Sequence, residues 1–419
     1  MTVTSVFNLA AIVVTLAAVF GYLNHRWLKL PHTIGLVVIA LLGSVAVLAL
    51  DAVVPGLRLR EAVRETLVEV DFHETLMKGM LGFLLFAGAL HVDLAALLTR
   101  KWAISTLATV GILLSTAIVA AVMYQVLAWI GLDMPFAYCL VFGALISPTD
   151  PIAVLSILKK VHVPTSLETK IAGESLFNDG VGVVVFTLLV AVATGGGEHG
   201  GAVTAGGIAM LLATEALGGA ALGFAAGYVA YRGMRSIDAY NLEVLITLSL
   251  VMATYGIAST IYVSGPIAVV VAGLLIGNHG ARFAMSETTR DHVDTFWELL
   301  DEVLNSVLFL TIGFEVVALT FDAGIATAMV VAVPVVLLAR FISVATPIGL
   351  LGLWREFTTG AIPVLTWGGL RGGISVALAL SLPAVPAKPL ILAMTYGVVV
   401  FSIVVQGLTI ERVVRHVVR

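Results

Sequence analysis

Long apolar runs follow one another along almost the whole 419-residue chain, and only short polar segments separate them. A run of about 20 apolar residues is long enough to cross a membrane as a helix. On that criterion the sequence predicts about thirteen transmembrane helices and no separate soluble domain. The predicted ranges are 5–24, 32–50, 73–91, 102–130, 134–158, 169–193, 203–231, 240–262, 264–278, 295–318, 323–350, 356–381 and 386–411.

The composition agrees with this prediction. The chain is 60% hydrophobic and only 11% charged, which excludes a soluble globular protein. Its single cysteine, Cys139, excludes a disulfide framework and a thiolate metal site. We therefore predict an all-α polytopic membrane protein that resides in the cell (inner) membrane and binds no nucleic acid.

The positions of Lys and Arg predict the orientation. If the N-terminus lies outside and the spans alternate, most basic residues fall on the inner side, as the positive-inside rule requires. The outer segments then contain only Arg58, Arg60, Arg64 and Lys388. This asymmetry predicts an outer N-terminus and a cytoplasmic C-terminus. Residues 51–72 alternate charged and apolar residues and are expected to form an outer surface helix.

Two apolar ranges contain acidic residues at membrane depth. Residues 147–151 read SPTDP and include Asp150, and residues 173–180 read GESLFNDG and include Glu174 and Asp179. Ionisable groups at this depth are energetically costly, so each is a functional-site hypothesis. We predict that the two stretches form one site for a cation and a proton.

Both halves of the chain contain an interrupted helix. Pro151 disfavours helical geometry at Asp150, and four glycines surround Arg371 in the sequence GGLRGG. A Gly-rich linker at 194–207 separates the two halves. Interrupted spans at matching places in two halves are typical of transporters built from inverted repeats, whose broken helices cross at the midplane.

Helical spacing assigns faces to the acidic span. Ser175 and Asp179 are four residues apart and share a face. Glu174 lies about 140° around the helix from Asp179 and should seek its own partner. Arg340, alone within an apolar range, is the candidate, and a Glu174–Arg340 pair would be structural.

The remaining polar residues of the two stretches suit a dehydrated cation. Thr149 and Asp150 offer oxygen ligands, which hard cations prefer, and the Asn178 amide can hold Asp150 or the unwound backbone. A buried acid can hold a proton or a metal ion but not both, and this competition suffices for exchange. Three acids and two arginines give the core a net charge of −1, which suggests one-for-one, electroneutral exchange.

Five stretches together resemble the monovalent cation/proton antiporter family, in the sodium/proton exchanger branch that carries an Asn-Asp pair. They are SPTDP at 147–151, ESLFNDG at 174–180, SGPIAV at 264–269, FWELLDEVLN at 296–305 and GGLRGGIS at 368–375. The resemblance implies that Asp179 is the ion-binding and proton-carrying acid. It also implies further ligands or site contacts from Thr149, Asp150 and Ser175, support from Asn178, a structural Glu174–Arg340 pair and an Arg371 that stabilises the helix crossing.

The same resemblance implies an architecture and an activity. A core of about 102–193 and 323–411 would move like an elevator against a dimerisation part of about 5–91 and 203–318, in a homodimer. The activity would be antiport of Na⁺, with Li⁺ or K⁺ as alternatives, against H⁺, with a role in pH homeostasis. Such a protein is not an enzyme and needs no cofactor.

Several alternatives stay open at this point. A cation channel, or a proton-coupled carrier of another small solute, would use some of the same acids. Glu298, Asp301 and Glu302 either focus cations at a cytoplasmic funnel or form an ordinary solvated helix start. Ala87 occupies the position of an acid that many members of the resembled family carry, which removes a possible ligand and leaves the ion preference open.

Overall fold

The computed structural model describes residues 3–54, 58, 60–61, 63, 79–151, 154–155, 158, 165–195, 205–318, 322–353 and 360–417. Within these residues the chain is helical, and its one β-type pairing is a single antiparallel bridge between Asp150 and Leu370. Residues 51–53 of the predicted surface helix at 51–72 belong to the end of a longer helix, His32–Val53, and most of its remaining residues lie outside the described ones, as does most of the predicted linker at 194–207. The all-α prediction is confirmed.

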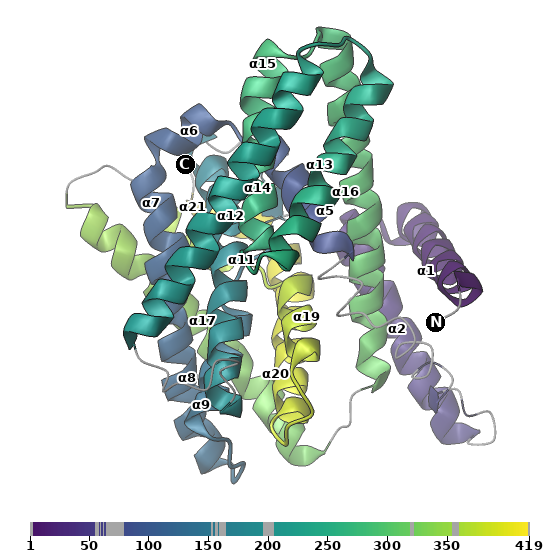
Figure 1. The fold of residues 1–419 in the computed structure, drawn as a ribbon. Helices are drawn as coiled ribbons and strands as arrows, with labels where there is room; N and C mark the ends of the chain where they lie inside the picture. Colours follow the sequence, from purple (N-terminus) through teal and green to yellow (C-terminus); the bar gives the residue numbers. More distant parts are fainter. Residues whose placement is uncertain are drawn as a thin grey trace.

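The helices of the first half correspond to the first six apolar ranges (Figure 1). They are α1 (Val3–Leu23), α2 (His32–Val53), α5 (Leu81–Leu90), α6 (Leu94–Thr99), α7 (Lys101–Thr106), α8 (Ile112–Trp129), α9 (Phe136–Ile146) and α11 (Thr165–Thr194). A π-helical turn, η4 (Leu107–Gly111), joins α7 to α8, so that these segments form one long helix.

The helices of the second half correspond to the remaining ranges. They are α12 (Ala205–Met234), α13 (Tyr240–Thr260), α14 (Gly265–Leu275), α15 (Ala281–Phe283), α16 (Glu287–Glu315), α17 (Ala323–Leu351), α18 (Ala361–Trp367), α19 (Gly373–Ser381), α20 (Lys388–Phe401) and α21 (Gly407–Val417). The π-helical turns η5 (Ile276–Gly280) and η7 (Ser402–Gln406) extend α14 and join α20 to α21.

Eight helices within the described residues are long and apolar enough to cross a membrane. They occupy Ala10–Leu28, His32–Val53, Lys101–Trp129, Leu167–Thr194, Tyr240–Thr260, Gly265–Phe283, Ala323–Leu351 and Lys388–Val417. α5 and α9 are apolar but shorter. The chain is therefore a multi-pass membrane protein, and the total of about thirteen spans stays a prediction.

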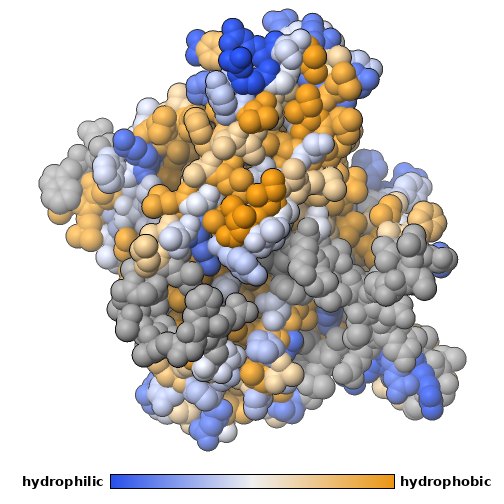
Figure 2. All heavy atoms as spheres, viewed as in Figure 1, coloured by the Kyte–Doolittle hydropathy of each residue, from blue (hydrophilic) through white to orange (hydrophobic). Residues whose placement is uncertain are grey.

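The surface has the polarity of a membrane protein. Figure 2 shows hydrophilic residues gathered at the two ends of the visible face, with hydrophobic residues over the broad region between them. Large apolar side chains such as Leu217, Val229 and Val330 are exposed on the helices. A surface of this kind is stable against lipid tails and would be unfavourable in water.

The helices pack in two groups, visible in Figure 1 as α8, α9 and α17 at the lower left and α5, α13, α14 and α16 at the upper centre. Small residues permit close approach in both. A side chain at Gly143 on α9 would lie 2.5 Å from the Thr116 carbonyl of α8, and one at Gly223 on α12 would lie 2.1 Å from the Ala268 carbonyl of α14. Such contacts replace the hydrophobic driving force that is absent between helices in lipid.

Two helices are interrupted where the sequence predicts it. α9 ends at Ile146 and the chain is extended or irregular from Ser147 to Pro151, while α18 ends at Trp367 and α19 begins only at Gly373. The backbone N–H of Asp150 donates to the Leu370 carbonyl at 2.8 Å. The two breaks therefore meet, and α11 packs beside them against α9.

Candidate functional site

The polar residues of α11 are buried against the two breaks. Glu174, Ser175, Asn178 and Asp179 are all less than one-tenth exposed, although the helix around them is apolar. Buried polar groups in a membrane protein need partners, because lipid supplies no hydrogen bonds. The partners of these four residues define the site.

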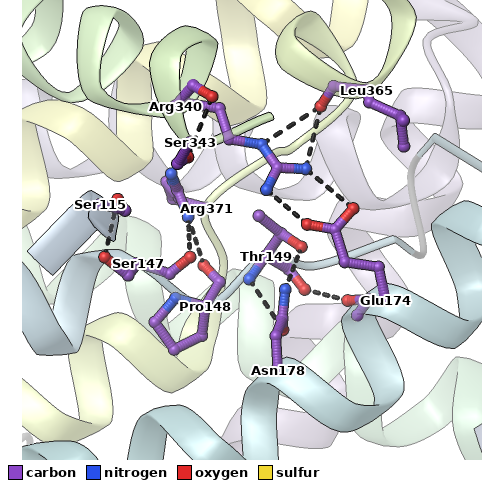
Figure 3. A network of polar contacts seen from close by, with 11 residues as sticks. Ser115, Ser147, Pro148, Thr149, Glu174, Asn178, Arg340, Ser343, Leu365 and Arg371 are labelled. Carbon is purple, nitrogen blue, oxygen red and sulfur yellow. Dashed lines mark hydrogen bonds and ion pairs between the residues drawn. The ribbon is translucent and has the colours of Figure 1, made fainter. Parts of the chain in front are cut away.

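Thr149 is held by two residues of α11 (Figure 3). The Asn178 side chain donates from Nδ2 to Thr149 Oγ1 at 2.8 Å, and its Oδ1 accepts from the Thr149 backbone N–H at 3.3 Å. Ser175 Oγ donates to the Thr149 carbonyl. Asn178 thus supports the unwound backbone rather than Asp150, and the oxygen atoms of Thr149 and Ser175 converge.

Asp150 and Asp179 are the two carboxylates of the site. Asp150 lies against Gly372 so closely that a Cβ added there would be 2.2 Å from Asp150 Oδ2. Asp179 is 7% exposed and interacts electrostatically with Asp150, and within the described part of the chain no hydrogen bond to its carboxylate is found. Asp150 is half-buried, and two carboxylates in such a site repel each other unless a proton or a cation is shared between them.

Glu174 faces away from this pair and contacts Arg340 of α17. The guanidinium binds both carboxylate oxygens, with Nη1–Oε1 at 2.5 Å and Nη2–Oε2 at 3.1 Å, and both side chains are buried. Arg340 also donates to the Leu365 carbonyl from Nε at 3.2 Å and from Nη2 at 3.0 Å. The pair fastens α11 to α17 and to the end of α18, with bidentate geometry that only Arg provides.

Arg371 lies between the two broken helices. Its Nη1 donates to the carbonyls of Ser147 and Pro148, the latter at 2.9 Å. These carbonyls follow the C-terminal end of α9, where helical hydrogen bonding stops and negative partial charge accumulates. The guanidinium therefore satisfies the acceptors that the break leaves free.

A series of hydrogen bonds through two residues of η7 supports the Arg371 backbone. The Arg371 N–H donates to Ser402 Oγ at 2.9 Å, and Ser402 in turn donates to Gln406 Oε1 at 2.7 Å. Gln406 Nε2 donates to the Trp367 carbonyl at 2.9 Å. The sequence analysis missed both residues, although two polar side chains four apart in an apolar range were a usable signal.

The three acids of the predicted cytoplasmic funnel, all on α16, have different environments. Glu298 is 69% exposed and lies 3.9 Å from His91, and Glu302 is exposed. Asp301 is half-buried and interacts electrostatically with Asp150. Only Asp301 of the three is thus coupled to the two-carboxylate site.

Ala87 is buried in α5, and its carbonyl accepts a hydrogen bond from His91 Nδ1 at 2.8 Å. Its neighbour Phe86 packs on Trp297 of α16, with ring centroids 4.6 Å apart. The position therefore contributes to the packing of α5 on α16 and offers no ligand oxygen from its side chain.

The family model described as "Sodium/hydrogen exchanger, transmembrane" matches residues 14–416. The chain is 46% identical over 415 residues to the Na(+)/H(+) antiporter NhaP of Pseudomonas aeruginosa, covering 98% of this chain and 96% of that protein. It is 35% identical over 392 residues to the Na(+)/H(+) antiporter NhaH of Halobacillus dabanensis, covering 93% of each.

A solved structure has the same fold. The sodium proton antiporter MjNhaP1 from Methanocaldococcus jannaschii at pH 8 superposes with a TM-score of 0.76 and 17% sequence identity, covering 99% of both chains. The match of the family model to nearly the whole chain, and the identity to curated relatives over nearly their whole length, establish the family. The chain belongs to the sodium/hydrogen exchanger family.

Proposed function

We propose that this protein is a secondary active antiporter that exchanges a monovalent cation for H⁺ across the membrane. Na⁺ is the proposed cation, with Li⁺ and K⁺ as alternatives. The observation that carries the proposal is a pair of mutually repelling carboxylates, the buried Asp179 and the half-buried Asp150, where two interrupted helices meet. The identities to proteins named Na(+)/H(+) antiporters support it. The family consists of transporters rather than enzymes, and its transported ions are substrates, not cofactors.

Each site residue has a proposed role. Asp179 carries the proton or the cation, since its carboxylate is buried beside Asp150. Asp150, Thr149 and Ser175 supply further oxygen ligands or site contacts, and Asn178 holds Thr149 in place. Oxygen donors of this kind suit a hard monovalent cation.

Exchange then requires only competition and alternating access. When the cation leaves, the repulsion between Asp150 and Asp179 favours uptake of a proton, and a new cation displaces that proton. If the site opens to one side of the membrane at a time, each crossing moves either a proton or a cation. Glu174, Arg340 and Arg371 stay paired with the scaffold throughout and maintain the shape of the site.

The packing of the helices supports a division into two parts. We propose a core of about 102–193 and 323–411, because α8, α9, α11, α17 and α20 pack mainly on one another. The dimerisation part, about 5–91 and 203–318, contains α2, α5, α12, α13, α14 and α16, which also pack mainly on one another. Elevator-like movement of the core against this part, in a homodimer, would give alternating access.

We further propose the cell (inner) membrane as the location, with the N-terminus outside and the C-terminus cytoplasmic, and pH homeostasis as the role. The asymmetric distribution of Lys and Arg supports this orientation. On this orientation Glu298, Asp301 and Glu302 lie toward the cytoplasmic side. They would form a funnel that concentrates cations near Asp150, to which Asp301 is electrostatically coupled.

The decisive experiment uses the purified full chain in proteoliposomes with an acidic interior and an internal pH dye. Adding Na⁺, Li⁺ or K⁺ outside is expected to alkalinise the interior, and the most effective ion identifies the substrate. The rate should not change when the membrane voltage is clamped at different values, because one cation replaces one proton.

Other results separate the alternatives. A rate that follows the voltage contradicts one-for-one exchange. Cation flux that carries no protons indicates a channel. A failure of all three cations to change the interior pH contradicts the proposed exchange and favours a carrier of another solute.

Close packing at Gly372 provides a second test of the site. We expect Gly372→Ala to lower the exchange rate by about tenfold or more, because the added methyl would overlap the Asp150 carboxylate and displace it. Gly349→Ala, which meets no atom within 4 Å, is the matched control and should exchange normally. Normal exchange by Gly372→Ala would show that the position of Asp150 is not critical.

A further inference from the structure

Asn305 of α16 is a buried amide to which the proposed site assigns no role. The side chain is 1% exposed. Among the described residues its amide interacts with the Asp301 carboxylate, and no donor reaches its Oδ1. Buried polar atoms are nearly always hydrogen-bonded, so a buried amide oxygen without a donor calls for a ligand or an ordered water. An amide also offers a carbonyl oxygen of the type that binds alkali cations.

The position of Asn305 on α16 places it next to an acid. Asp301 precedes it by four residues, so the two side chains share one face of the helix, and they lie close to each other. Asp301 is half-buried, whereas Glu298 and Glu302 are exposed. Along this face the side chains pass from an exposed acid through a half-buried acid to a fully buried amide.

The same face of α16 is directed at the break between α18 and α19. Leu308, three residues beyond Asn305, packs so tightly on Gly373 that a Cβ there would lie 2.4 Å from its Cδ1. Asp301 interacts electrostatically with Asp150. Asn305 therefore lies on α16 between Leu308, which contacts the first residue of α19, and Asp301, which interacts electrostatically with Asp150.

We infer that Asp301 and Asn305 form an accessory cation subsite on α16, where a partly hydrated monovalent cation is held before it reaches Asp150 and Asp179. The inference rests on the proposed exchange function. Asp301 supplies the charge that attracts the ion, and Asn305 supplies a neutral oxygen that replaces part of its water shell.

In this arrangement the main site and the accessory subsite lie on different parts of the protein. The main site belongs to α9, α11 and the break at 368–372, whereas the accessory subsite belongs to α16. A cation would be captured on one part and released into the other. The subsite should therefore affect the concentration of cation needed for transport more than the speed of the transport cycle.

The test measures initial exchange rates against Na⁺ and Li⁺ concentration, with the full chain in proteoliposomes at fixed pH gradient and zero voltage. Asn305→Leu keeps the branching and the number of side-chain heavy atoms but removes the oxygen. We expect it to raise the KM for Na⁺ by about tenfold, as for the loss of one polar contact, with the maximal rate within about twofold. Asn305→Asp keeps an oxygen and should restore the KM to the natural value or below it.

The same assay tests whether Asp301 and Asn305 act on one ion and whether the effect is specific to these two residues. Asp301→Asn should also raise the KM, and the double variant with Asn305→Leu should raise it by less than the product of the two single effects, because both residues serve one ion. Thr311→Val is the matched control. Its buried hydroxyl lies on the same helix but is satisfied by the Val307 carbonyl at 2.7 Å, and its KM should not change.

Three results would overturn the inference. They are an unchanged KM in Asn305→Leu, a lower maximal rate at unchanged KM, or strictly multiplicative effects of the two α16 variants. If Asn305→Leu does not fold, Asp301→Asn decides the matter, since an unchanged KM for Na⁺ in that variant rejects the subsite. Absence of exchange by the natural protein would instead reject the proposed function.

Discussion

Replacing Asp179 with Asn is expected to reduce cation–proton exchange to the level of empty liposomes. Asn has nearly the same shape, but its amide can neither take up a proton near neutral pH nor neutralise the charge of a cation. With Asp150 then the only carboxylate at the site, the repulsion that drives proton uptake disappears. The measurement is the change of interior pH on addition of Na⁺, Li⁺ or K⁺ to proteoliposomes.

The same variant should fold at least as well as the natural protein. The substitution removes the buried member of two repelling carboxylates and leaves a neutral group of nearly equal size. We therefore expect an equal or higher melting temperature in cation-free buffer. A silent variant that melts normally assigns the defect to the chemistry of the site.

Glu243→Gln is the matched control for this prediction. Glu243 is also fully buried, but it lies on α13, outside the proposed site. This variant should exchange normally. Normal exchange by Asp179→Asn would refute the central assignment, and a silent Glu243→Gln would show that any buried carboxylate is required.

Replacing Arg340 with Met is expected to destabilise the protein by about 3–5 kcal/mol, the usual effect of removing one partner of a buried ion pair. Glu174 would keep its charge in a buried site without the guanidinium that binds both of its oxygens. The Leu365 carbonyl would lose both of its donors from Arg340. The measurement is the melting temperature and the yield of monodisperse protein in detergent.

The double variant Glu174→Gln with Arg340→Met should recover much of the lost stability, because no buried charge remains unpaired. Arg415→Met is the control at an exposed pair, where Arg415 lies 2.8 Å from Glu411 and its loss should change stability by about 0–1 kcal/mol. Equal effects of Arg340→Met and Arg415→Met would contradict a structural role for the buried pair. So would a double variant that is no more stable than the single one.

Much of the local architecture could be predicted from the sequence. Apolar runs of membrane length predicted the helices, because in lipid each segment must satisfy its own backbone hydrogen bonds. Pro151 and the glycines around Arg371 predicted the two interruptions, since these residues weaken a helix wherever it lies. Helical spacing alone placed Glu174 on a different face from Asp179.

Contacts between residues far apart in the sequence were harder to predict. The sequence singled out Arg340 for Glu174 because few buried cations were available, but it allowed Asn178 to hold either Asp150 or the backbone. The structure has Asn178 on Thr149. It also separates Asp301, which is coupled to Asp150, from the exposed Glu298 and Glu302, which look equivalent in the sequence.

By itself the sequence determined a multi-pass helical membrane protein with acids at broken helices, because periodicity, proline and glycine act locally. Only the tertiary structure decided that the Asp150 N–H pairs with Leu370, that Arg371 satisfies the carbonyls after α9, and that Ser402 and Gln406 support it. These contacts join segments more than thirty residues apart. Their geometry depends on how whole helices pack, which no local pattern of residues encodes.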